Sequence, residues 1–224
     1  MNASRRRLAT VLGLVAMSLF CVALVLVRYL QSGSTDFLGL IWNLVLAWIP
    51  LVLAVVVYDR WRRHGARPAL LALGALWLLF FPNAPYIVTD FVHLDRTADA
   101  PYWYDAVTVS AFAWTGVLLG FASLFLMQTV VRQWRGVVSG WAFAGAALAL
   151  GSLGISLGRF LRLNSWDAVE HPRVLPSILH AVARDPFAYR EAIGVTVLFT
   201  VALGFAYLLL YSFTVVGREL DVER

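Results

Sequence analysis

Six apolar runs, separated mostly by short polar connections, are the feature that most constrains the fold of this chain. All but the third are long enough to cross a hydrocarbon layer of roughly 30 Å at roughly 1.5 Å per helical residue. Only 14% of the 224 residues are charged, against roughly a quarter in a soluble domain. We therefore predict an all-α fold: a polytopic transmembrane helical bundle that forms one membrane domain over residues 1–224. The predicted spans are residues 8–27, 37–58, 68–81, 106–127, 137–161 and 192–216.

The first apolar run follows Arg5, Arg6 and Arg7, an arrangement that also begins signal peptides. Its twenty residues exceed the apolar part of a signal peptide, and no small-x-small cleavage site follows it. We therefore predict an uncleaved first span. Cys21, the only cysteine, lies in this run, which leaves no partner in the chain for a disulfide and no thiolate metal cluster. We expect Cys21 to pack as a small apolar side chain.

The arginines divide unevenly between the two sides of the predicted bundle, and the chain has no lysine. The side with both termini carries eleven arginines and four acidic residues, whereas the other side carries seven and nine. Because positively charged loops stay in the cytoplasm, we predict cytoplasmic termini and a location in the cell (cytoplasmic) membrane. Topology then explains the net charge of +5, which gives no support to a nucleic-acid partner. The use of arginine alone has two open explanations, codon composition and phosphate recognition.

The segment Phe80–Asp95, F-F-P-N-A-P-Y-I-V-T-D-F-V-H-L-D, gathers polar and ionisable residues at the outer end of the third span. Pro82 and Pro85 lack amide hydrogens and push the residues before them away from helical dihedrals. We therefore predict a proline-broken third segment that leads into an outer interfacial helix. Asn83 is suited to cap that helix by accepting a hydrogen bond from the Tyr86 amide. Whether the third span stops at the prolines or continues past them is open.

An α-helical spacing after the prolines would place Tyr86, Asp90, His93 and Thr97 on one face, at i, i+4, i+7 and i+11. Two interpretations of this stripe are open. It contacts water on an interfacial helix, or Asp90 and His93 face the bundle, where the carboxylate orients the imidazole. Ionisable groups inside membrane spans are costly and usually have a function, which favours a site here.

A metal site is a sharper version of that second interpretation, because Asp90, His93 and Asp95 offer oxygen and nitrogen ligands. A closed zinc site needs three or four ligands, so Asp167 or His171 would have to complete it. The chain has no His-Glu-x-x-His motif. We predict no metal and no other cofactor.

The end of the fifth span supplies the cationic residues of the outer side, since Ser152, Ser156, Arg159 and Arg162 share a helix face. The arginines either extend to lipid headgroups or bind a carboxylate or phosphate through both guanidinium N–H groups. In the second case we predict that one of them contacts an outer carboxylate, namely Asp90, Asp95 or Asp167.

Two glycine motifs lie inside predicted helices. The run G-I-S-L-G at residues 154–158 matches the nucleophile-elbow pattern, but that pattern requires a strand-turn-helix context, which argues against a serine hydrolase. Gly154 and Gly158, like Gly116 and Gly120, instead have the spacing of close helix packing.

These polar residues together predict a cup that opens outward and binds a polar or anionic group such as a lipid headgroup. Asn43 lies inside the second span, and Thr108, Ser110 and Glu191 are further polar residues of the outer halves, although each would also suit a simple helix-helix hydrogen bond. The candidate binding residues are Asn43, Asn83, Tyr86, Asp90, His93, Arg159, Arg162, Asn164 and Asp167. The expected partners are the bilayer, lipid headgroups or a membrane partner protein.

Two alternatives to the binding protein are open. The first is a membrane enzyme that uses Asp90 and His93 as acid-base groups or metal ligands on a lipid-linked substrate. The second is a structural or accessory protein in which these residues only hold helices together. The inner halves of the spans are nearly free of polar groups, which counts against a transport pathway.

Three stretches carry a resemblance to a known family. They are the runs W-L-L-F-F-P-N-A-P-Y-I-V-T-D at residues 77–90, W-Y-D at residues 103–105 and G-R-F-L-R-L-N-S-W-D at residues 158–167. The chain resembles, over about residues 35–215, an uncharacterised bacterial membrane family, domain of unknown function 1361. The resemblance implies a bacterial multi-pass membrane protein and brings no reaction, substrate or partner with it.

Overall fold

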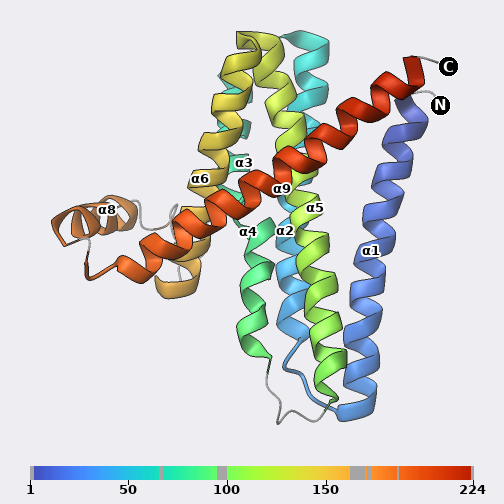
Figure 1. The fold of residues 1–224 in the computed structure, drawn as a ribbon, viewed down its shortest axis with the longest axis vertical. Coiled ribbons are helices and arrows are strands. Elements are labelled where there is room, and N and C mark those ends of the chain that lie inside the picture. Colours follow the sequence, from blue (N-terminus) through green and yellow to red (C-terminus); the bar gives the residue numbers. More distant parts are fainter. Residues whose placement is uncertain are drawn as a thin grey trace. The chain divides into compact units, whose positions relative to one another are not determined.

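The computed structural model describes residues 3–65, 68–94, 100–161, 170, 173–185 and 187–222, and within them every regular element is a helix (Figure 1). The elements are α1 (Ala3–Ser32), α2 (Leu38–His64), α3 (Pro68–Phe80), α4 (Asn83–Tyr86), the 3₁₀ helix η1 (Ile87–His93), α5 (Tyr102–Arg135), α6 (Val137–Leu161), α8 (Val174–Arg184) and α9 (Arg190–Val222). The described residues contain no strand, and the predicted all-α class is confirmed.

Six of the helical stretches are long and apolar enough to cross a membrane. They are Arg7–Ser32, Leu38–His64, Pro68–Val92, Tyr102–Arg135, Val137–Leu161 and Arg190–Thr214. The chain is therefore a multi-pass membrane protein, as predicted. Most of the helices extend beyond the predicted spans by a turn or more, because polar residues at their ends continue the helix past the apolar run.

The chain divides into two compact units, Met1–Val130 and Val131–Arg224, which are described separately below. That the whole chain acts as one membrane domain stays a prediction.

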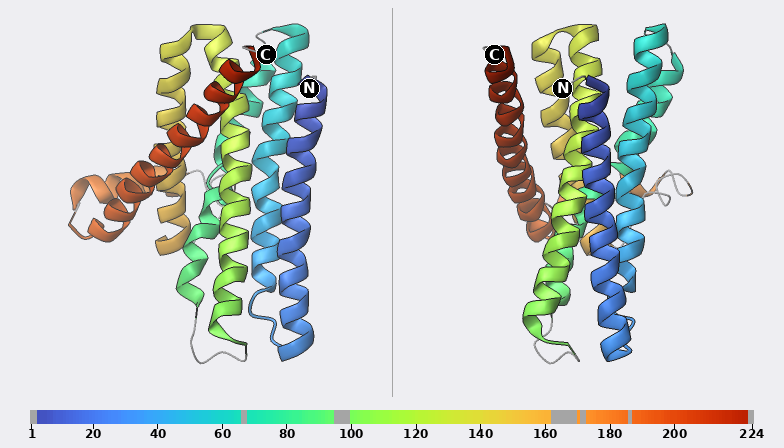
Figure 2. Two further views of the ribbon diagram at one scale, coloured as in Figure 1. Left: turned by 45° about the vertical axis from the view of Figure 1, so that its right-hand side comes forward. Right: turned by 90° about the vertical axis from the view of Figure 1, so that its right-hand side faces the viewer.

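In the first unit, α1, α2 and α5 lie side by side, together with the segment from α3 to η1 (Figure 2). One apolar core joins them, with members that include Val25 on α1, Leu44 on α2, Ile87 on η1 and Phe112 on α5. Cys21 is fully buried, with its Sγ 3.4 Å from the Oγ1 of Thr115. Its expected role as a small packing side chain agrees with this position.

The proline pair breaks the third helix but does not end the span. α3 ends at Phe80, a turn follows at residues 81–82, and α4 begins at Asn83. The backbone of Pro82 nevertheless keeps right-handed helical dihedrals, with φ −58° and ψ −29°. The chain therefore continues onward as a broken helix, and the candidate span runs to Val92.

The prediction that Asn83 caps a new helix is wrong. The residue at the cap position of α4 is Pro82, and Asn83 is the first residue of the helix itself. The Asn83 Nδ2 donates to the carbonyl oxygen of Phe80 at 3.0 Å. The Tyr86 amide, the expected donor to the cap, donates to the carbonyl oxygen of Pro82 at 3.0 Å. A cap requires non-helical dihedrals at the start of a helix. Because Pro82 stays helical, the Tyr86 amide has a backbone acceptor and needs no side chain.

The segment after the prolines is also wound differently from the α-helix that was predicted. α4 has four residues, and η1 continues it as a 3₁₀ helix, in which side chains at i and i+3 lie above one another. Accordingly Ala84, Ile87 and Asp90 are all buried. Asp90 therefore shares its face with Ala84 and Ile87, and not with Tyr86, because side chains repeat every third residue in a 3₁₀ helix. Thr97 lies outside the described residues.

The backbones of α5 and α4 approach closely at Gly116 and Gly120. A Cβ on Gly116 would collide with the carbonyl oxygen of Ala84 and would lie 3.0 Å from the Cδ1 of Ile87. A Cβ on Gly120 would lie 3.2 Å from the Cβ of Ala84. The close packing predicted for this G-x-x-x-G motif is confirmed, whereas that for the motif at residues 154–158 stays a prediction.

In the second unit, α6 and α9 cross obliquely and pack along their length (Figure 1). The hydroxyl groups of Ser156 on α6 and Thr196 on α9 lie 2.8 Å apart. Nearer the other end, the ring of Trp141 packs edge-on against Tyr211, with centroids 4.8 Å apart. Arg132 Nη1 also donates to the Tyr211 hydroxyl at 2.9 Å. Polar and aromatic contacts thus hold this helix pair together at both ends.

Candidate functional site

The structure brings together two of the predicted binding residues, Asn43 and Asp90. Asn43 lies in the second turn of α2 and Asp90 lies in η1, and the Nδ2 of Asn43 donates to the Oδ2 of Asp90 at 3.1 Å. Asp90 is 5% exposed, whereas Asn43 is half-buried. The open question about the stripe is therefore answered for Asp90, whose carboxylate faces the other helices of its unit.

Three other predicted binding residues belong to the same segment as Asp90, namely Asn83, Tyr86 and His93. Asn83 is half-buried, and its side-chain amide donates to the backbone carbonyl oxygen of Phe80, three residues earlier. Tyr86 is half-buried, and its carbonyl oxygen accepts a hydrogen bond of 2.8 Å from the Thr89 hydroxyl. The backbone of His93 ends η1, but its side chain lies outside what the structure describes. The pairing of Asp90 with His93 stays a prediction.

The predicted cationic residues belong to the second unit. Arg159 lies in the last turn of α6 and is half-buried. Arg162, Asn164 and Asp167 lie outside the described residues. The predicted contact between an arginine and an outer carboxylate therefore stays a prediction.

The proposed metal ligands are only partly described. Within the described ranges, no group of three or more His, Cys, Asp and Glu side chains is arranged to hold a metal ion. Asp95, Asp167 and His171 lie outside those ranges.

Several further polar side chains of the outer halves bond to their own helix. The hydroxyl of Thr108 donates to the carbonyl oxygen of Tyr104 at 2.9 Å, and that of Ser110 donates to the carbonyl oxygen of Ala106 at 2.7 Å. Such i→i−4 bonds satisfy a hydroxyl inside an apolar helix. Glu191 is exposed at the start of α9. The hydrogen bonds described for Thr108 and Ser110 thus lie within α5 and do not link these residues to Asn43 or Asp90.

The serine of the G-I-S-L-G run, Ser156, lies inside the helix α6 near its C-terminal end and is buried, 1% exposed. The expected helical context is confirmed, and this serine is not on a strand-turn-helix elbow. Its hydroxyl contacts Thr196 of α9, which is a helix-packing role.

A buried ion pair between α1 and α5 is a polar contact that sequence reasoning missed. The Arg28 Nε donates to the Asp105 Oδ1 at 2.7 Å, and its Nη2 donates to the Oδ2 at 3.1 Å. Both side chains are 2% exposed. The guanidinium also lies over the ring of Phe37, 4.3 Å from its centroid. This bidentate geometry is the strongest form of a charge-assisted hydrogen bond.

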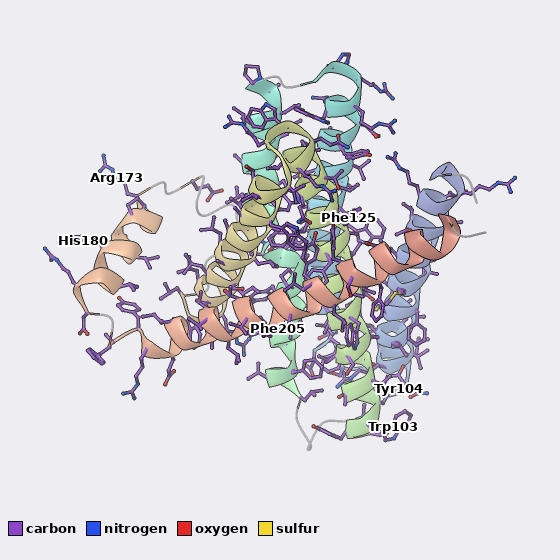
Figure 3. The ribbon with its side chains drawn as sticks, turned by 45° about the horizontal axis from the view of Figure 1, so that its top comes forward. Trp103, Tyr104, Phe125, Arg173, His180 and Phe205 are labelled. Carbon is purple, nitrogen blue, oxygen red and sulfur yellow. The ribbon has the colours of Figure 1, made fainter. Side chains whose placement is uncertain are left out.

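Tyr104, next to Asp105, reinforces the same junction. Figure 3 labels this tyrosine on α5. Its hydroxyl donates to the Leu24 carbonyl oxygen of α1 at 2.8 Å. The available signals were Arg28, which directly follows the first apolar run, and the W-Y-D run at residues 103–105. Spacing along the chain cannot pair them, because 77 residues separate Arg28 from Asp105.

Comparison with known proteins identifies a family for this chain but no activity, ligand or partner. Residues 42–216 match the family described as Protein of unknown function (DUF1361). No curated protein and no solved structure matches the chain. The matched range includes Asn43, Asp90 and Asp105, but Arg28 precedes it. The match covers more than half of the residues and confirms the expected resemblance. This chain, a multi-pass membrane protein, therefore belongs to the DUF1361 family.

Proposed function

We propose that this membrane protein binds a lipid headgroup at an outer polar cup, to which Asn43 contributes an amide and Asp90 a carboxylate. The observation that carries the proposal is the 3.1 Å hydrogen bond between their side chains, inside two candidate spans. A carboxylate within a span is costly and is usually kept for a function. Because the Asn43 side chain is only half-buried, a ligand could approach the hydrogen-bonded pair of Asn43 and Asp90 from that side.

The chemistry of this pair favours a headgroup that donates hydrogen bonds. A carboxylate accepts N–H and O–H donors and repels phosphate. The ammonium group of phosphatidylethanolamine fits these requirements, whereas the trimethylammonium group of phosphatidylcholine has no N–H donor.

Native mass spectrometry of the purified protein tests the proposal. We expect the unsubstituted protein to retain phosphatidylethanolamine in preference to phosphatidylcholine, and Asp90→Asn to reduce that preference about tenfold, since a charge-assisted hydrogen bond contributes roughly 1.5–3 kcal/mol. Asp36→Asn is the matched control, because Asp36 is exposed and bonds only locally to Ser34 in the described structure.

The result that would contradict headgroup binding is an unchanged lipid preference in Asp90→Asn. A lower melting temperature of that variant with an unchanged preference would support a structural role for Asp90 instead. Equal retention of the two lipids by the unsubstituted protein would contradict the proposal directly.

The proposed topology places the cup on the outer side of the cell membrane, with both termini in the cytoplasm. The arginine distribution supports this orientation. We expect reporter fusions after positions 64, 99, 134 and 175 to be cytoplasmic, external, cytoplasmic and external. An active periplasmic reporter at position 64 would contradict the charge argument.

A further inference from the structure

Helix α8, Val174–Arg184, has a strongly one-sided distribution of polar residues. Arg173, which precedes it, and Ser177, His180 and Arg184 follow at i, i+4, i+7 and i+11, which is one helix face. All four are exposed. The side chains of Arg173 and His180 point away from α9 (Figure 3). We call this set the α8 cationic stripe.

The opposite face of α8 is apolar. Ile178 and Val182 lie about 140° and 180° around the helix from Arg173, at roughly 100° per residue, and both are half-buried. The sequence V-L-P-S-I-L-H-A-V-A-R has no acidic residue. With eleven residues the helix is also too short to span a membrane. A short helix with one apolar face and one basic face is typical of an interfacial helix.

The position of α8 in the chain keeps it close to the membrane boundary. The candidate span of α6 ends at Leu161, and that of α9 begins at Arg190. Five residues, 185–189, separate α8 from α9. At about 3.5 Å per residue they reach at most about 18 Å, so α8 cannot move far from the membrane surface.

We propose that α8 lies in the plane of the membrane interface and that the α8 cationic stripe binds the phosphates of anionic phospholipids. The apolar face with Ile178 and Val182 enters the boundary between headgroups and acyl chains. The guanidinium groups of Arg173 and Arg184, at the two ends of the stripe, bind phosphate oxygens through paired N–H donors. This surface is independent of the cup at Asn43 and Asp90.

Spin labels on α8 test the proposed orientation in the full-length protein. Cys21 can stay in place, because it is fully buried and should take up no label, which the parent protein verifies. We expect nitroxides at Ile178→Cys and Val182→Cys to collide with oxygen several-fold more often than those at Ser177→Cys and His180→Cys. The nitroxides at positions 177 and 180 should instead collide more often with a water-soluble nickel chelate. The samples are nanodiscs of phosphatidylcholine, with and without phosphatidylglycerol.

The second part of the test concerns the headgroup. Adding phosphatidylglycerol should raise oxygen exposure at position 182, and Arg173→Gln with Arg184→Gln should abolish that rise. Arg60→Gln with Arg63→Gln, two exposed arginines of α2, is the matched control and should leave the rise intact.

Each contrary result overturns a stated part of the proposal. Nickel accessibility on both faces would mean that α8 lies in water. Accessibility to neither reagent at positions 178 and 182 would mean that this face packs on protein. No effect of phosphatidylglycerol, or an undiminished effect in the double arginine variant, would remove the anionic lipid as the partner.

Discussion

Replacing Asp105 with asparagine is expected to lower the free energy of unfolding in detergent micelles by about 3–5 kcal/mol. The substitution keeps the shape of the side chain but leaves the Arg28 guanidinium buried without its counter-charge. Both side chains are 2% exposed, so water cannot replace the lost carboxylate. The measurement is the midpoint of unfolding by a denaturing detergent, followed by circular dichroism.

The exposed pair between Arg7 and Asp59 provides the matched control for that substitution. Its atoms lie 3.8 Å apart, and the two side chains are about half exposed. Asp59→Asn should therefore cost less than about 1 kcal/mol. The double substitution Arg28→Met and Asp105→Leu should recover much of the loss, because it removes both buried charges. Equal effects of Asp105→Asn and Asp59→Asn would contradict a stabilising role for the buried pair.

Gly116→Ala is expected to destabilise the first unit by about 1–3 kcal/mol, the usual cost of overpacking. The added methyl group would collide with the carbonyl oxygen of Ala84, which is backbone and cannot rotate away. This penalty should exceed the roughly 1 kcal/mol that alanine gains over glycine in a helix. Because α4 leads directly into η1, we also expect the variant to disturb the Asn43–Asp90 hydrogen bond.

Two other glycines calibrate that result in the same unfolding assay. A Cβ on Gly13, in the middle of α1, would meet nothing within 4 Å, so Gly13→Ala should be neutral or stabilising. Gly120→Ala should lie between the two, because its nearest neighbour would be the Ala84 Cβ at 3.2 Å. If Gly116→Ala were as stable as Gly13→Ala, the close approach of α5 and α4 would be wrong.

The regular elements were largely predictable because membrane spans depend on local composition. A run of apolar residues must form its backbone hydrogen bonds internally in lipid, which leaves the helix as the available structure for each run. The break at Pro82 and Pro85 was likewise predictable, since a missing amide is a property of the residue itself. The continuation of that span to Val92 was not, because proline permits both outcomes.

The candidate site was predictable only in part. Asn43 and Asp90 were each recognised as polar residues inside apolar surroundings, and their hydrogen bond joins residues 47 positions apart. From α-helical spacing we predicted that Asp90 shares a helix face with Tyr86. In the structure it shares a face with Ile87, because η1 is a 3₁₀ helix. A change from 3.6 to 3.0 residues per turn is enough to move a side chain to another face.

The sequence by itself determined that this chain is an all-helical membrane protein with six candidate spans. Those properties follow from hydropathy and residue type, which act over a single turn or a single span. Only the tertiary structure decided that Arg28 pairs with Asp105, that Asn43 bonds to Asp90 and that Gly116 touches the backbone of Ala84. Each of these contacts joins separate helices, and the pairing of helices depends on side-chain packing and close backbone approach between segments far apart in the chain.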